Sequence, residues 1–298
     1  MGCHFGADER LAAEELVRLA LAEDLGEAGD LTCRALVAAD ERAEVLVVAR
    51  EAGVLAGGPV ARLVFENLDR EVEWQPKVDD GSKLSRGMVV AKVVGPLRSL
   101  LTGERTALNF LQHLSGVATL TRKFVEAVAG TRAVILDTRK TIPGWRLLEK
   151  YAVRAGGGTN HRIGLYDGCL IKDNHLAAWS EWRKGASLAD AVREARRQVA
   201  RGISVEIEVD TLEQLADALD GAPDIVLLDN MSTQLLLQAV KLRNERAPNV
   251  QLEASGGVTL ETVAEIAKTG VERISVGALT HSARALDLAF DWSRHVGK

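Results

Sequence analysis

The chain has 298 residues, of which 47% are hydrophobic, enough for one large domain or two ordinary ones with a sizeable core. Its formal charge of −5 argues against a generally basic, nucleic-acid-binding surface, so any site for a polyanion must be a local basic pocket. Three scattered cysteines indicate neither a disulfide framework nor a zinc site, and we find no signal peptide and no apolar run of about 20 residues. We therefore expect a soluble, cytoplasmic protein that binds neither nucleic acid nor membrane.

The first hundred residues predict a mixed α+β lobe. Apolar residues recur with helical spacing from 9 to 22, and the apolar run from 45 to 49 indicates a strand. A Gly-Gly-Pro sequence at 57 to 59 predicts the start of another helix, because proline is favoured in a first helical turn. The apolar run from 88 to 94 is bracketed by glycines and predicts a second strand.

From residue 133 onward, short apolar strands alternate with amphipathic helices. We expect strands at 133–137, 169–172, 205–209, 225–229, 251–255 and 273–277. We expect helices at 188–199, 212–219, 235–246 and 262–268. This alternation indicates parallel βαβ units, and short repeats of this kind favour a barrel over an open doubly wound sheet.

Polar residues and one glycine collect at the carboxyl ends of the expected strands. They are Asp137, Lys172, Glu208, Asp229, Ser255 and Gly277. Any one of them could cap a helix. Because the active sites of α/β barrels are built at this rim, six such residues in register predict a shared site.

Two glycine turns on consecutive late strands indicate a phosphate site. Ser255-Gly256-Gly257 follows one strand, and Val276-Gly277-Ala278 follows the next. Glycine allows backbone N–H groups to approach an anion beside a helix N-terminus. A single Ser-Gly-Gly would be a weak signal, but the pair favours a phosphate cradle.

Cationic side chains cluster in the loops of the same half, although the protein as a whole is acidic. The sequence Thr138-Arg139-Lys140 is followed by His161-Arg162 and then by Lys172. Arginine suits bidentate binding of carboxylates, and lysine supplies a compact charge for phosphate or carboxylate. Each could be a solvated loop charge, and His161 alone favours a structural or surface role. Their density within 34 residues favours a functional group for an anionic ligand.

Glu208 and Asp229 supply the opposite charge on neighbouring strands. They could hold Mg²⁺ directly or through water, and could stabilise positive charge developing on a ribosyl carbon. Glu206 lies on the same strand face as Glu208 and is an alternative in either role. A zinc site is disfavoured because no histidine pair has ligand spacing.

Long stretches of the chain resemble the quinolinate phosphoribosyltransferase family from about residue 10 onward. The segments are TGERTALNFLQHLSGVAT at 102–119, LDTRKTIPGWRLLEKYAVRAGGGTNHRIGLYDGCLIKDNH at 136–175, EIEVDTLEQL at 206–215, IVLLDN at 225–230 and EASGGVTLETVAEIAKTGVERISVGALTHS at 253–282. The Thr-Arg-Lys block with the downstream Gly-Gly-Gly-x-Asn-His-Arg is highly specific. Trp145, where the family more often has Leu, and Asp173, where Glu is frequent, are small departures that touch no expected ligand.

The resemblance implies a type II phosphoribosyltransferase fold. An α+β open-faced sandwich lobe would span residues 1–116, and an incomplete parallel α/β barrel would span 117–279. The final helices, at 280–298, would return to the first lobe. A homodimer would complete each site, with Arg105 contributed by the partner subunit.

The resemblance also implies a role for each candidate residue. Arg139, His161, Arg162 and Lys172 would bind quinolinate together with Arg105, and Thr138 would line the same site. Lys140 would serve both substrates. Glu208 and Asp229 would contact the ribose hydroxyls and Mg²⁺. Ser255, Gly256, Gly257, Val276, Gly277 and Ala278 would cradle the 5′-phosphate of phosphoribosyl pyrophosphate.

The implied reaction joins quinolinate to phosphoribosyl pyrophosphate and gives nicotinate mononucleotide, pyrophosphate and CO₂, with Lys140, Glu208 and Asp229 catalytic. It is a step in NAD biosynthesis. One alternative is a related phosphoribosyltransferase of altered substrate, such as a nicotinate-specific enzyme or a molybdenum-locus homologue. Another is a non-catalytic phosphate-binding protein on the same barrel. Retention of every cationic and acidic position disfavours both.

Overall fold

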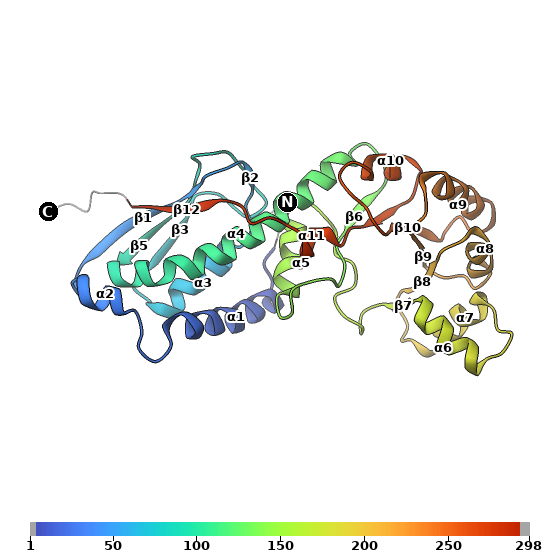
Figure 1. Cartoon of the computed structure of the whole chain (residues 1–298), viewed down its shortest axis with the longest axis horizontal. Coiled ribbons are helices and arrows are strands. Elements are labelled where there is room, and N and C mark those ends of the chain that lie inside the picture. The colour runs from blue at the N-terminus through green and yellow to red at the C-terminus, as the bar shows by residue number, and fades with distance from the viewer. Residues whose placement is uncertain (1–3, 293–298) are drawn as a thin grey trace. The chain divides into compact units, whose positions relative to one another are not determined.

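The computed structural model describes residues 4–292, and the chain forms two compact units (Figure 1). The first unit contains residues up to 122, 141–157 and residues from 278 onward. The second contains 123–140 and 158–277. Compared with the expected division, residues 141–157 lie in the first unit because their helix packs against the first helix of the chain.

The first unit is built on an antiparallel sheet of four strands. Its order is β12 (Leu288–Trp292), β1 (Arg42–Ala49), β5 (Val89–Pro96) and β3 (Glu73–Pro76). A separate pair joins β2 (Gly53–Val54) to β4 (Lys83–Leu84). The expectation of helices at 280–298 is wrong within the described residues, because 288–292 form a strand whose alternate side chains Leu288 and Phe290 are buried.

Helices cover this sheet because they present apolar faces to it. The first unit contains α1 (Ala7–Leu25), α2 (Leu31–Leu36), α3 (Gly58–Leu68), most of α4 (Leu97–Ala127), α5 (Arg146–Ala155) and α11 (Ala278–His281). In α3, the buried Phe65 stacks on Trp74 of β3 and on Phe290 of β12, with ring centroids 6.1 Å apart in both pairs. This aromatic contact seats α3 on the sheet.

The second unit contains a parallel sheet of six strands with helices between them. Its order is β6 (Val134–Leu136), β11 (Arg273–Ser275), β10 (Gln251–Ser255), β9 (Ile225–Asp229), β8 (Val205–Val209) and β7 (Cys169–Ile171). The helices are α6 (Asp173–Trp182), α7 (Leu188–Gln198), α8 (Leu212–Asp220), α9 (Thr233–Arg246) and α10 (Val263–Lys268). The predicted α/β class is confirmed, with an antiparallel sheet in the first unit and a parallel sheet in the second.

Side-chain alternation along the strands separates two faces of the second sheet. In β8, Val205, Ile207 and Val209 are fully buried, whereas Glu206 and Glu208 occupy the opposite face. Strands β6 and β7 stand at the two edges of the sheet. Next to β6, Thr159 forms an isolated parallel bridge with Leu136, so a non-strand segment adds to that edge.

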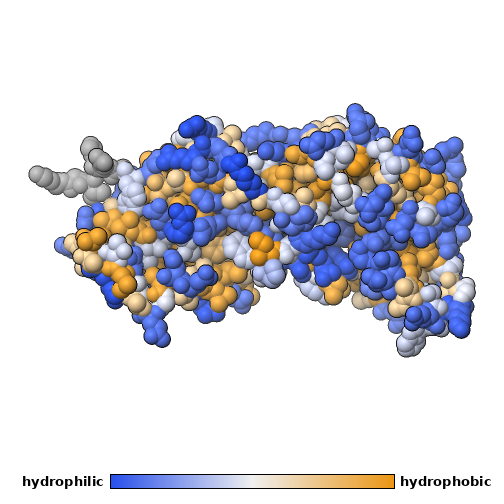
Figure 2. Space-filling view, viewed as in Figure 1, coloured by the Kyte–Doolittle hydropathy of each residue, from blue (hydrophilic) through white to orange (hydrophobic). Residues whose placement is uncertain are grey.

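No helix among residues 4–292 is long and apolar enough to cross a membrane. On the face shown in Figure 2, hydrophilic residues are interspersed with hydrophobic ones. The largest fully buried side chains, including Tyr151, Phe110 and Ile207, belong to the cores of the two units.

Candidate active site

The carboxyl ends of neighbouring strands bring four predicted site residues to one edge of the second sheet. Lys172 follows β7, and its ammonium group forms an ion pair with the carboxylate of Glu208 on β8. Asp229 ends β9 and stands in register with Ser255, the last residue of β10. Inward-facing positions on parallel strands therefore collect a lysine, two carboxylates and a hydroxyl at this rim.

The turn after β10 requires glycine. Gly256 has φ +90°, and a Cβ there would clash with the side-chain amide of Asn230 and lie 2.9 Å from its backbone nitrogen. Asn230 is itself left-handed and donates its N–H to the Ser255 carbonyl at 2.9 Å. The backbone of this turn is thus packed against Asn230 too closely for a side chain, and the phosphate role of Ser255, Gly256 and Gly257 stays a prediction.

The second glycine turn begins where β11 ends. Val276 donates its N–H to the carbonyl of Leu136 at 2.9 Å, which fixes the start of this turn against β6. Gly277 is the last residue of the second unit, and Ala278 begins α11 in the first. The phosphate role of Val276, Gly277 and Ala278 stays a prediction.

Arg139 lies close enough to Arg162 for its positive charge to act on the pKa of Arg162. Burial lowers the pKa of Arg162, and the neighbouring Arg139 guanidinium lowers it further. Arg162 also donates from Nη1 to the Gly168 carbonyl at 2.8 Å. In the same block, Lys140 is exposed and donates its N–H to Oγ1 of Thr138 at 3.0 Å. The positive charges of Arg139 and Arg162 are thus held near each other.

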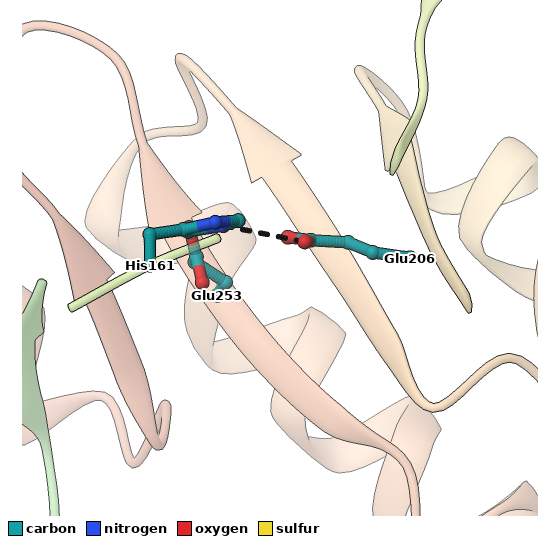
Figure 3. Close-up of side chains that lie close together, drawn as sticks. All are labelled: His161, Glu206 and Glu253. Atoms are coloured by element: carbon teal, nitrogen blue, oxygen red, sulfur yellow. Dashed lines mark ion pairs between the residues drawn. The ribbon is translucent and has the colours of Figure 1, made fainter. Parts of the chain in front are cut away.

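His161 points toward Glu206 on β8 and Glu253 on β10 (Figure 3). Its Nε2 lies 3.3 Å from Oε2 of Glu206 and 3.3 Å from Oε1 of Glu253. Glu253 also accepts a hydrogen bond from Nε of Arg273 at 2.7 Å. Glu206 is 4% exposed and Glu253 is fully buried, so the two carboxyl groups of this polar cluster are buried while His161 and Arg273 stay partly exposed.

The distribution of protons in this cluster follows from its contacts. Burial lowers the pKa of His161, but the two carboxylates outweigh it and raise the pKa to about 9. Nδ1, however, accepts the Arg162 N–H at 2.8 Å, which requires that nitrogen to be unprotonated. Burial, followed by the charge of Glu253, raises the pKa of Glu206. We therefore place the extra proton on Glu206, which gives the same total number of protons as a charged ring would.

The same contact argues against a metal ion at this cluster. The ligand atoms of His161, Glu206 and Glu253 lie within 4.8 Å of one another, which is close enough to hold an ion. With Nδ1 occupied as an acceptor, Nε2 must carry the ring proton and cannot coordinate. The contacts within this cluster are therefore consistent with protons bridging the three side chains.

Sequence reasoning missed Glu253 and Arg273 and misjudged Asp137. An acid between Leu252 and Ala254 in a buried strand was the available signal for Glu253. Asp137 was expected at the functional rim, but it is fully buried and accepts hydrogen bonds from the Asn160 side chain at 2.6 Å and the His161 N–H at 2.9 Å. It anchors the segment that follows β6.

A cavity of about 500 Å³ opens among the amino-terminal ends of the strands in the second unit. His161, Arg162 and Glu206 line it together with Ser204 and Gln251, which precede or begin strands. None of Lys172, Glu208, Asp229 and Ser255 is among its lining residues. His161 and Arg162 therefore line this cavity at the amino-terminal ends of the strands, together with none of the four rim residues.

Arg105 lies in the first unit, on α4, where its side chain is exposed. Its predicted role across a subunit interface stays a prediction.

Comparisons with known proteins point to one family. Two family models match, the N-terminal domain of quinolinate phosphoribosyl transferase over residues 30–115 and the C-terminal domain over 117–291. The nicotinate-nucleotide pyrophosphorylase (carboxylating) of Mycobacterium leprae is 48% identical over 282 residues, covering 94% of this chain and 97% of that protein. A probable enzyme of the same name from Bacillus subtilis is 41% identical and covers 94% and 93%. The solved nicotinate-nucleotide pyrophosphorylase of Francisella tularensis is 40% identical, with a TM-score of 0.86 and coverage of 95% and 96%.

Proposed function

The chain belongs to the quinolinate phosphoribosyltransferase family, and on that premise we propose that it converts quinolinate and phosphoribosyl pyrophosphate to nicotinate mononucleotide, pyrophosphate and CO₂. The substrates meet at the carboxyl rim of the second unit. Arg139, Arg162 and Lys172 bind the dicarboxylate, and the glycine turns after β10 and β11 bind the 5′-phosphate.

The proximity of Arg139 and Arg162 carries this proposal. Arg139 and Arg162 place two partly buried guanidinium groups near each other, with the carboxyl groups of Glu206 and Asp167 offsetting part of the charge at Arg162. Quinolinate has two carboxylates on adjacent ring carbons, and paired guanidinium groups match that arrangement.

Glu208 and Asp229 act on the sugar carbon. The pyridine nitrogen attacks the anomeric carbon as pyrophosphate leaves, and the transition state has oxocarbenium character. Two carboxylates on neighbouring strands place negative charge beside that carbon before the reaction begins. The ion pair with Lys172 fixes the direction of the Glu208 carboxylate.

The donor set at the rim fits Mg²⁺, which prefers oxygen ligands and usually keeps several waters beside one or two carboxylates and substrate phosphates. Glu208 and Asp229 would hold the ion, and Lys172 on Glu208 favours contact through water. When bound, Mg²⁺ neutralises charge on the departing pyrophosphate.

Decarboxylation follows from the first step. Once the ring nitrogen is alkylated it is cationic, and it stabilises the carbanion left when the adjacent carboxylate departs as CO₂. The task of Arg139, Arg162 and Lys172 is to orient that carboxylate and to hold the other one.

The assembly that we propose is a homodimer in which Arg105 of one subunit completes the dicarboxylate site of the other. A cytoplasmic location also stays a prediction, which cell fractionation would check.

One assay separates this function from its alternatives. With Mg²⁺ and phosphoribosyl pyrophosphate, the purified protein should release CO₂ and pyrophosphate in equal amounts from quinolinate. Turnover of nicotinate without CO₂ would indicate the nicotinate-specific alternative. Binding of either substrate without turnover would indicate the non-catalytic one.

A further inference from the structure

The segment from 159 to 163 runs along the edge of the six-stranded sheet that is formed by β6. Thr159 donates its N–H to the Ile135 carbonyl at 2.8 Å, and the Asp137 carboxylate accepts the His161 N–H at 2.9 Å. These contacts attach the segment to a single edge strand. A segment held along one edge by its backbone needs a further contact to fix its orientation.

The side chain of His161 provides that contact. It reaches from the β6 side to Glu206 on β8 and Glu253 on β10, as Figure 3 shows. Burying two carboxylates is expensive unless they are paired and hydrogen-bonded, and Arg273 and the ring N–H supply those partners. Oε1 of Glu206 and Oε1 of Glu253 both lack a hydrogen bond among the described residues, although Oε1 of Glu253 lies 3.3 Å from the ring nitrogen and its Oε2 accepts from Arg273.

The other nitrogen of the ring acts on the next residue. Nδ1 of His161 accepts the backbone N–H of Arg162, so the two glutamates, by engaging Nε2–H, select the tautomer that holds Arg162. The Arg162 guanidinium is then placed beside Arg139 and against the Gly168 carbonyl. The chain of contacts runs from the glutamates through the ring to the arginine.

We propose that Glu206 and Glu253 are positioning residues for the dicarboxylate substrate, acting through the inward-turned ring of His161 to set the backbone and side chain of Arg162. This inference rests on the proposed function. It gives His161 a role through Arg162, without contact between its ring and the substrate, and it gives Glu206 a role distinct from that of Glu208.

Substitutions at Glu206 test the proposal in the full-length enzyme. Glu206→Leu removes one acceptor from the ring, and we expect the KM for quinolinate to rise about tenfold, as for the loss of a buried hydrogen bond. The KM for phosphoribosyl pyrophosphate and kcat should stay within about twofold. Glu206→Gln keeps an acceptor oxygen and should restore most of the quinolinate affinity. Glu265→Leu, at an exposed position on α10, is the matched control and should behave as the wild type.

The outcomes separate this proposal from a purely structural role and from the function itself. An unchanged quinolinate KM in Glu206→Leu, or equal increases for both substrates, would overturn the positioning role. Failure of the wild type to convert quinolinate would overturn the proposed function instead.

A spectroscopic measurement covers the case in which Glu206→Leu does not fold. In the wild type labelled with ¹⁵N-histidine, the ring signals of His161, assigned by comparison with His161→Asn, should show a protonated Nε2 and an unprotonated Nδ1. A protonated Nδ1 would contradict the proposal.

Discussion

The ammonium group of Lys172, directly after β7, is ion-paired with the Glu208 carboxylate on the adjacent strand β8. The lysine side chain is 43% exposed, whereas that of Glu208 is 13% exposed, so the lysine can reach a substrate while the carboxylate stays fixed. The pair thus combines a partly exposed ammonium group with a largely shielded carboxylate.

Glu208→Gln should lower kcat about a hundredfold, because it removes charge that stabilises the oxocarbenium-like transition state while keeping the shape of the side chain. The KM for quinolinate should change by less than about threefold. Steady-state kinetics with saturating Mg²⁺ would measure both. A rise in quinolinate KM with unchanged kcat would assign Glu208 to binding alone.

Arg162→Lys should raise the KM for quinolinate about tenfold or more, because lysine keeps the charge but loses the planar pair of donors that matches a carboxylate. The KM for phosphoribosyl pyrophosphate should stay near the wild-type value. Calorimetric titration of each substrate would provide an independent comparison. Equal weakening of both substrates would argue against a dicarboxylate role.

Gly256→Ala should weaken the binding of phosphoribosyl pyrophosphate and leave the binding of quinolinate nearly unchanged. The added Cβ meets Asn230, and φ +90° is strained for alanine, so the turn must move away from its anion-binding shape. Gly130→Ala is a suitable control, because Gly130 has φ +84° and no heavy atom within 4 Å of the new Cβ. A similar loss in the control would show that backbone strain alone is responsible.

Glu272→Ala should destabilise the second unit by about 3 kcal/mol at pH 7, because it leaves the buried Arg243 without its carboxylate. The two side chains are joined by hydrogen bonds of 2.8 and 3.2 Å. Urea unfolding of the variant and the wild type would measure the difference.

The same pair should make stability depend on pH. Burial opposes the shift, but Arg243 lowers the pKa of Glu272 below its ordinary value of 4.5. The stabilisation is therefore complete above about pH 4.5 and is lost as pH falls through the lower folded-state pKa. The difference in the free energy of unfolding between wild type and Glu272→Ala should therefore become smaller as the pH falls below about 4.5. A difference that does not change with pH would contradict the ion-pair account.

Mixing two inactive variants should restore activity if Arg105 acts across subunits. Arg105→Ala and Lys140→Ala each damage a different part of one site, so a hybrid dimer contains one intact site. After subunit exchange, about a quarter of wild-type activity is the expected maximum for random pairing. No recovery, with exchange verified by mass spectrometry of the dimers, would remove the shared-site prediction.

The parallel sheet was predictable because its strands are short, apolar and regularly spaced. β8, β9 and β10 have the bounds that the sequence indicated, since each is flanked by polar or glycine turns. The last strand, β12, was missed although Leu288, Phe290 and Trp292 alternate in the manner of a strand. Its pairing with β1 joins residues about 240 positions apart, and a local sequence pattern cannot predict which strand is the pairing partner.

The rim was more predictable than the interior. Lys172, Glu208, Asp229 and Ser255 follow from the rule that inward positions at strand ends meet, which needs only strand bounds. The direction of the His161 ring could not be derived, because residues 158–168 have no regular period and their conformation depends on Asp137 and on two glutamates far along the chain.

The interleaving of the two units has a consequence for how the protein is made. The chain passes between them at residues 122, 140, 157 and 277, and β12 occupies a place in the first sheet beside β1. During synthesis, the first sheet therefore cannot be completed until nearly the whole polypeptide has been made, because its edge strand β12 is close to the end of the chain. Truncation after the apparent amino-terminal lobe would leave β1 with an exposed edge, a surface prone to aggregation.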